Sequence, residues 1–273
     1  AVTGVSIGGL FAGGISAGVL LATLYILYIF IRGLLDPGFA PALAPEERVS
    51  WGEKLISVRS VFFPGMLIVL VLGTILLGIA SPTEAAAFGA AGAIVIGLIN
   101  RRLTWEIVHS SCYETLSVTA MVGFMMIGAG AFGSVFSGLG GNAIVADFAM
   151  NMPGGANMVF VVAAIFVFIL GMFLEPGAVI FLAVPIIAPI LSRLGFDPLW
   201  IGLAINVILQ SAYISPPFGF SLFYLKGCTP PDIDIIEIYK SSLPLLTLQA
   251  ICLVIIFMFP QIILWLPRYL LGF

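Results

Sequence analysis

The chain has 273 residues, of which 61% are hydrophobic and 8% charged, with a mean hydropathy of +1.22 and a formal net charge of -3. Soluble domains carry about 25% charged residues, so this composition indicates an integral membrane protein. The ten Lys and Arg residues form no basic run, which argues against a nucleic-acid partner. The three cysteines are widely spaced and odd in number, so they predict neither a disulfide framework nor a zinc site.

The N-terminal part of the chain is predicted to alternate membrane spans with one polar surface segment. Ala12 to Ile31 is a first span, and the proline-rich polar stretch at 33–60 predicts a surface loop followed by an interfacial helix. Val61 to Ala80 and Ala85 to Ile99 then form a tight pair of spans. Glu84 lies between them, where an acidic side chain caps the first turn of the second helix.

The segment that follows is predicted to run along the membrane surface before it crosses. Thr104 to Tyr113 is amphipathic, which is typical of a helix lying on the bilayer, and Thr115 to Phe136 is apolar enough to cross. Residues 138–155 are rich in Gly and Asn and predict an external loop with a short helix.

Residues 157–192 contain two apolar runs of about 15 residues, separated by Leu174-Glu175-Pro176-Gly177. Each run reaches roughly 22 Å as a helix, whereas the hydrocarbon core is about 30 Å thick and usually needs about 20 apolar residues. The short runs predict a re-entrant hairpin. With Ala1 outside, this topology places eight of the ten Lys and Arg residues inside, against six when the hairpin becomes one extra crossing.

A second break is predicted inside the broken helix 199–226. Leu199 to Ser211 enters the membrane and meets Tyr213-Ile-Ser-Pro-Pro-Phe-Gly219, where adjacent prolines end the helix. Phe220 to Leu225 completes the crossing. Residues 230–240 follow as a polar loop or surface helix, and Leu243 to Leu266 is the last predicted span.

The two breaks offer paired helix ends at mid-membrane depth. Carbonyl ends lie at Phe173 and Ser211 and amide ends at Ala178 and Phe220, and each end carries roughly half an elementary charge. Carbonyl ends coordinate cations, whereas amide ends attract anionic substrate groups. The alternative is that both breaks are proline kinks that serve helix packing alone.

Three polar side chains near the breaks each have two interpretations. Glu175 is an acid at mid-membrane depth, which costs several kcal/mol unless the charge is neutralised or paired. It either takes part in cation or proton binding or is a protonated carboxyl that caps the second arm. Asn206 and Gln210 are one helical turn apart and either face a polar cavity or make interhelical hydrogen bonds.

Motifs typical of enzymes are absent or out of context. Gly128-Ala-Gly-Ala-Phe-Gly133 matches a dinucleotide pattern but lies inside an apolar span, and Glu106-Ile-Val-His109 is half of a di-iron motif without a second copy. The sequence has no P-loop, zinc-protease helix or nucleophile elbow. These observations favour ion-coupled transport and predict no enzyme activity. An intramembrane enzyme using Glu175 and a non-transporting structural subunit are the alternatives.

Three motifs resemble the large membrane subunit of tripartite ATP-independent periplasmic (TRAP) transporters. They are Gly78-Ile-Ala-Ser-Pro-Thr-Glu-Ala-Ala86, Gly171-Met-Phe-Leu-Glu-Pro-Gly177 and Leu209-Gln-Ser-Ala-Tyr-Ile-Ser-Pro-Pro-Phe-Gly-Phe-Ser-Leu-Phe-Tyr-Leu-Lys-Gly227. The last motif, with Ile238-Tyr-Lys240, Leu248-Gln249 and Phe259-Pro260, is most similar to the mannitol/chloroaromatic-type branch. The resemblance covers the second half of a typical large subunit, so the N-terminal half is expected to be missing.

The resemblance implies an all-α integral membrane fold, the second inverted repeat of an elevator-type ion transporter, with one re-entrant hairpin and one broken helix. Residues 1–112 correspond to scaffold helices and an interfacial arm helix, 113–240 to the transport unit, and 241–273 to a C-terminal transmembrane helix. The implied activity is sodium-driven uptake of a small organic acid across the bacterial inner membrane. The implied partners are the lipid bilayer, a small membrane subunit and a periplasmic substrate-binding protein.

Carried over to this sequence, the resemblance places a sodium site and half of the substrate cavity at the two breaks. The sodium ligands correspond to Phe173, Leu174, Glu175, Pro176, Ser211, Ser215 and Gly219. The substrate residues correspond to Asn206, Gln210, Ser215, Pro216, Pro217 and Gly177. The family often has Asp at the position of Glu175 and Thr at that of Gly177. This departure favours backbone carbonyls over side chains as sodium ligands.

Overall fold

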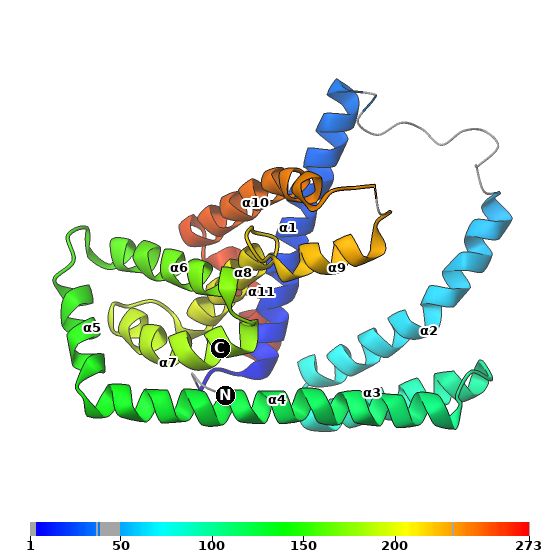
Figure 1. Cartoon of the computed structure of the whole chain (residues 1–273), viewed down its shortest axis with the longest axis horizontal. Coiled ribbons are helices and arrows are strands. Elements are labelled where there is room, and N and C mark those ends of the chain that lie inside the picture. Colours follow the sequence, from blue (N-terminus) through cyan, green and yellow to red (C-terminus); the bar gives the residue numbers. More distant parts are fainter. Residues whose placement is uncertain (1–3, 37, 39–49, 231, 273) are drawn as a thin grey trace.

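The computed structural model describes residues 4–36, 38, 50–230 and 232–272. Within these ranges the regular structure is entirely α-helical, and six helices are long and apolar enough to cross a membrane. The predicted all-α membrane class is therefore confirmed. The helices are α1 (Ile7–Leu35), α2 (Trp51–Leu76), α3 (Pro82–Ile99), α4 (Trp105–Gly138), α5 (Gly141–Met150), α6 (Gly155–Phe173), α7 (Pro176–Arg193), α8 (Pro198–Tyr213), α9 (Phe220–Cys228), α10 (Ile235–Met258) and α11 (Gln261–Leu271), shown in Figure 1.

The best-packed part of the molecule surrounds α8, which contacts α1, α6, α7, α10 and α11. Trp200 at its start is 2% exposed and packs against the rings of Phe160, Phe196 and Phe257, with centroid distances of 4.9, 5.3 and 6.1 Å. Its indole N–H donates a hydrogen bond to the Ile256 carbonyl at 3.2 Å, as a buried indole requires. This aromatic cluster fixes the start of the helix that ends at the second break.

The predicted pairing of the second and third spans is confirmed in α2 and α3. A Cβ atom at Gly92 would lie 2.4 Å from Leu67 Cδ1, so glycine permits the close approach of these helices. The predicted cap at Glu84 is also present. Its carboxylate accepts the Ser81 N–H at 2.7 Å, and the Ser81 hydroxyl oxygen accepts the Glu84 N–H at 3.3 Å. This reciprocal pair is a capping box.

Two predicted surface helices prove to be the first turns of longer helices. α4 runs without interruption from Trp105 to Gly138, so the predicted division near Glu114 is wrong. The polar residues there include no proline or glycine, and polarity alone does not end a helix. In the same way, α2 begins at Trp51 rather than at Val61. The predicted loop before it, at 37 and 39–49, lies outside the described residues.

The last span, predicted as one continuous helix from Leu243 to Leu266, is wrong, because the structure divides it into two helices. α10 ends at Met258, and α11 begins at Gln261. Pro260 has no N–H to donate and restricts Phe259, whose φ of -129° and ψ of 70° are not helical. α10 also begins at Ile235, so of the two alternatives predicted for 230–240, a polar loop or a surface helix, the second part of the segment is helical and continues into the last span.

The hairpin and the short helix before it are present, but the hairpin arms are longer than predicted. α6 has 19 residues and α7 has 18, which correspond to about 28 Å and 27 Å at 1.5 Å per residue. The apolar runs are shorter than the helices, because both helices extend into small and polar residues at their outer ends. Arm length by itself therefore no longer separates a re-entrant hairpin from two crossings.

The position of the turn is more informative than the length of the arms. The end of α6 packs against the end of α8, where a Cβ atom at Gly171 would lie 2.8 Å from the Cβ of Ala212. Figure 1 shows α9 extending away from this point, beyond the turn of the hairpin. The hairpin therefore turns at the level where the α8–α9 helix is broken.

Candidate functional site

The structure brings the two predicted breaks together. Gly171 lies against Ala212, and the Phe173 ring meets the Phe218 ring edge-on with centroids 5.8 Å apart. The first contact joins the ends of α6 and α8, and the second joins the hairpin tip to the loop before α9. The candidate site is therefore one region built from four helix ends.

At the hairpin tip, the helix ends are arranged by Leu174 and Glu175. Leu174 is extended, with φ -107° and ψ 149°, and its N–H donates to the Leu170 carbonyl at 2.8 Å. In the described part of the chain, the carbonyls of Gly171, Met172 and Phe173 receive no backbone N–H. Such orphan carbonyls at a helix end are available to a cation.

Glu175 occupies the amide end of α7. Its carboxylate accepts the Gly177 N–H at 2.9 Å, and the next residue, Pro176, has no N–H. The capping interpretation of Glu175 therefore has direct geometric support, whereas its protonation state and any ion contact remain predictions.

At the second break, two buried serines hold the end of α8. The Ser211 hydroxyl donates to the Val207 carbonyl at 2.9 Å, and the Ser215 N–H donates to the Ala212 carbonyl at 3.1 Å. Ser215 is 3% exposed, and its hydroxyl donates to the Pro216 carbonyl at 3.3 Å. Both hydroxyl oxygens keep lone pairs that a cation can use.

Gly219 joins this loop to α9 in a conformation that favours glycine. Its φ is 39°, and a Cβ atom would lie 2.9 Å from the Ser215 carbonyl oxygen. No side chain caps α9, and the N–H groups of Leu222 and Phe223 both donate to the Gly219 carbonyl. The N–H groups of Phe220 and Ser221 therefore form an open amide end. The peptide bond between Pro216 and Pro217 is cis.

Asn206 and Gln210 lie on an exposed face of α8. Neither side chain has a hydrogen bond to another helix within the described residues, and both interpretations of these amides stay predictions. Two exposed amides on an otherwise apolar membrane helix need a polar surface or water opposite them. This face leads along α8 towards the second break.

The two breaks are sparsely charged. Glu175 is the one charged residue in the segments 171–178 and 206–222. The described residues contain no group of three or more His, Cys, Asp and Glu side chains that could hold a metal ion. Any cation at this site would therefore be held mainly by backbone carbonyl and hydroxyl oxygens.

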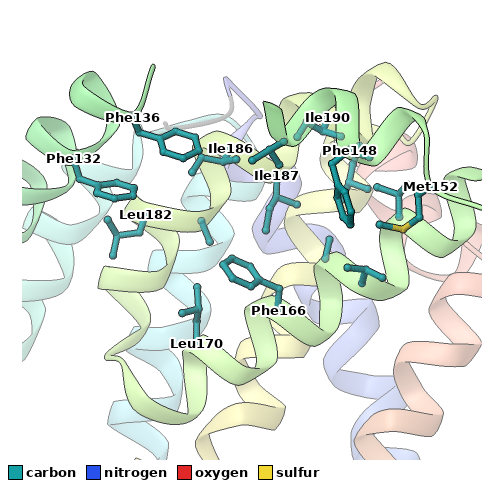
Figure 2. A pocket seen from close by; sticks show the side chains of 17 residues that line it. Phe132, Phe136, Phe148, Met152, Phe166, Leu170, Leu182, Ile186, Ile187 and Ile190 are labelled. Carbon is teal, nitrogen blue, oxygen red and sulfur yellow. The ribbon is translucent and has the colours of Figure 1, made fainter. Parts of the chain in front are cut away.

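Two cavities lie beside the hairpin and were not predicted. One has a volume of about 560 Å³, and Figure 2 shows Phe166 and Leu170 of α6 and Leu182 of α7 pointing into it. Its lining is apolar and comes from α4, α5, α6 and α7, without any predicted site residue. A second cavity, of about 570 Å³, lies between α4 and α7 and includes Ser137 and Asn142. No sequence signal separates such space from ordinary packing.

Comparisons with known proteins give a consistent family. Residues 1–262 match the model described as "Tripartite ATP-independent periplasmic transporter, DctM component". The chain is 29% identical over 272 residues to the ectoine TRAP transporter large permease of Halomonas elongata, covering 97% of this chain and 61% of that protein. It is 30% identical over 274 residues to the C4-dicarboxylate TRAP transporter large permease of Pseudomonas aeruginosa, covering 99% and 62%.

A third relative is the sialic acid TRAP transporter large permease of Vibrio cholerae. It is 28% identical over 277 residues, which cover 100% of this chain and 62% of that protein. The chain therefore spans about three fifths of the length of the relatives it matches.

Proposed function

Because the chain belongs to the DctM component family of TRAP transporters, we propose that it forms the part of a permease in which a sodium gradient drives the uptake of a small organic acid. The relatives are named as transporter permeases, and the chain is a transport protein of the inner membrane rather than an enzyme. The observation that carries the proposal is the contact between the two breaks, with the Phe173 and Phe218 rings 5.8 Å apart.

Sodium is a co-transported substrate in this proposal, and its ligands are oxygens at the ends of α6 and α8. The orphan carbonyls near Phe173 and the hydroxyls of Ser211 and Ser215 supply a set that suits a hard monovalent cation. The negative ends of two helix dipoles point to the same region. Glu175 adds a nearby carboxylate, whose main contact in this structure is with the Gly177 N–H.

The carboxylate of the organic acid is proposed to bind at the amide end of α9, near Phe220 and Ser221. This end carries no side-chain cap, whereas the amide end of α7 already faces the Glu175 carboxylate. Asn206 and Gln210 are proposed to contact the polar remainder of the substrate. Two of the relatives are named for C4-dicarboxylates and sialic acid, which supports an acidic substrate.

The re-entrant hairpin and elevator movement are part of this proposal. The turn of the hairpin lies at the level of the α8–α9 break, which supports a dive to mid-membrane and back more strongly than arm length does. The proposed partners are a small membrane subunit and a periplasmic binding protein, in keeping with the tripartite family. The motif resemblance supports placing the chain in the second half of a large subunit of the mannitol/chloroaromatic-type branch.

Uptake by the reconstituted assembly tests the proposal. The complete permease, with its small subunit and binding protein, is placed in proteoliposomes, and accumulation of C4-dicarboxylates, sialic acid and ectoine is measured with sodium or potassium outside. We expect accumulation that requires an inward sodium gradient. Accumulation indifferent to sodium would overturn the coupling. Product formation without a gradient would favour the intramembrane enzyme, and no accumulation of any acid would favour a structural subunit.

A further inference from the structure

One side chain of α10 reaches back to the loop of the second break. The Tyr239 hydroxyl donates a hydrogen bond to the Pro217 carbonyl at 2.7 Å, although the two residues are 22 positions apart. This is a short and well-formed O–H···O hydrogen bond. It connects the first turn of α10 to the loop that carries the proposed sodium and substrate ligands.

The loop from Ile214 to Gly219 has few other anchors. Pro216 and Pro217 have no N–H, and the hydrogen bonds made by Ser215 stay within the loop or the last turn of α8. Among the residues that the structure describes, Tyr239 supplies the one hydrogen bond that reaches this loop from another helix. Tyr239 therefore anchors this loop to α10, in addition to the hydrogen bonds that the loop makes with itself and with α8.

The peptide group held by Tyr239 is placed to influence both halves of the site. The Pro217 carbonyl belongs to the peptide that leads to Phe218, whose ring lies against Phe173 of the hairpin. The following residue, Gly219, lies so close to the Ser215 carbonyl that there is no room for a Cβ atom. Rotation of this one peptide would move the Phe218 ring, the Gly219 backbone and the amide end of α9 together.

α9 itself is held weakly by packing. Leu222 is its one buried residue, and its packing partners in the described structure are α8 and α10. At its other end, the Lys226 ammonium donates to the Ile233 carbonyl, just before α10. Two hydrogen bonds therefore connect the segment 233–239 to this region. The Ile233 carbonyl accepts one from Lys226 of α9, and the Tyr239 hydroxyl donates the other to Pro217 in the loop before α9.

We propose that Tyr239 is a positioning residue for transport: its hydroxyl holds the Pro217 peptide in register with the hairpin tip and thereby sets the affinity of the site for its ion and substrate. The inference rests on the proposed function for the identity of the ligands, but not for the hydrogen bond that it invokes. Tyr239 acts through the Pro217 peptide and is not itself one of the proposed ligands.

The test combines hydrogen exchange with transport in the complete permease, comparing wild type with Tyr239→Phe. Loss of one such hydrogen bond is expected to speed exchange of the amides at 218–221 about twofold to tenfold. The half-saturating concentration of sodium or substrate is expected to rise by about the same factor, with an unchanged maximum rate per assembled permease. Tyr224→Phe is the matched control, because Tyr224 lies on α9, is 78% exposed and should leave both measurements unchanged.

Unchanged exchange at 218–221 in Tyr239→Phe would overturn the inference, as would faster exchange with unchanged half-saturating concentrations. A fall in maximum rate that tracks a loss of assembled permease would also overturn it, because that pattern indicates a general structural role. If wild-type uptake proves indifferent to sodium, the proposed coupling fails. The positioning role is then decided by substrate alone: a raised half-saturating substrate concentration supports it, and an unchanged one overturns it.

Discussion

The two breaks interrupt membrane helices in chemically different ways. At the hairpin tip, the amide end of α7 is closed by the Glu175 carboxylate and by Pro176, which has no N–H. At the second break, the amide end of α9 begins at Gly219 and has no side-chain cap. Both breaks have a helix carbonyl end, but one amide end is occupied by the Glu175 carboxyl group and the other has no side-chain cap.

From this difference we propose different ends for the two ligands. A substrate carboxylate placed at α7 would approach the Glu175 carboxylate, and like charges repel strongly where water is scarce. A carboxylate at α9 would meet free amides and the positive end of a helix dipole. A cation would instead be stabilised by the carbonyl ends of α6 and α8 and by the nearby Glu175 carboxyl group. The following predictions break or sharpen this comparison.

Gly219→Val is expected to have the largest effect. A β-branched residue at φ 39° is strained, and its Cβ would lie 2.9 Å from the Ser215 carbonyl oxygen. Sodium-driven uptake per assembled permease should fall about tenfold or more. Gly195→Val is the control: its φ is 92°, but a Cβ atom there meets nothing within 4 Å. An equal loss of uptake in both variants would show that backbone strain alone is responsible.

Gly171→Val tests whether the two breaks must touch. The new side chain collides with Ala212, where even a Cβ atom would lie at 2.8 Å, so α6 is pushed away from α8. Overpacking of this kind costs about 1–3 kcal/mol, and we expect uptake to fall roughly tenfold, mainly through weaker sodium dependence. Gly128→Val on α4, which meets open space, should be near wild type. Unchanged sodium dependence in Gly171→Val would show that the contact between the hairpin tip and α8 is not needed for the proposed cation site.

Gln210→Leu tests the substrate side of the comparison. Removing the amide from the exposed face of α8 should raise the half-saturating substrate concentration about fivefold, the effect of losing about one hydrogen bond. The half-saturating sodium concentration should hardly change, because the Gln210 amide is not one of the proposed sodium ligands. Thr247→Val, on an exposed part of α10, is a control for a polar-to-apolar change. A shift confined to sodium would contradict the assignment.

Glu175→Gln is expected to have the smallest effect. Glutamine keeps an oxygen that can accept the Gly177 N–H while removing the charge. If backbone carbonyls hold the ion, the half-saturating sodium concentration should rise less than about threefold, which corresponds to well under 1 kcal/mol. Glu175→Ala should do more damage, because it also removes the cap of α7. Reversed effects of the two variants would assign the carboxylate a direct role with the ion.

Local chemistry made both breaks predictable, whereas packing decided how they meet. Pro176 is the first residue of α7, where its missing N–H costs nothing, and the adjacent prolines at 216 and 217 lie in the loop after α8. Single prolines at 64, 185, 189, 244 and 267 lie inside helices. Glu84 caps a helix together with Ser81, three positions away. The contacts of Gly171 with Ala212 and of Tyr239 with Pro217 depend on how distant segments pack, which periodicity does not encode.

The errors have the same origin. Polar residues near Glu114 predict a boundary although nothing there stops a helix. The apolar run around Pro260 predicts a continuous span, although α10 ends just before this proline. At these two places the helix ends follow backbone chemistry more closely than hydropathy. The boundaries predicted at 112 and 240 fall inside the continuous helices α4 and α10, and the division into scaffold and transport unit remains a prediction.

Equilibrium binding of radioactive sodium to the purified complete permease tests the central assignment most directly, because it measures the ion site without transport. Wild type, Glu175→Gln and Gly219→Val are compared, with Gly195→Val as the control. We predict that Glu175→Gln and Gly195→Val bind sodium nearly as wild type does, whereas Gly219→Val loses binding. Complete loss of binding in Glu175→Gln, together with binding retained in Gly219→Val, would contradict the account.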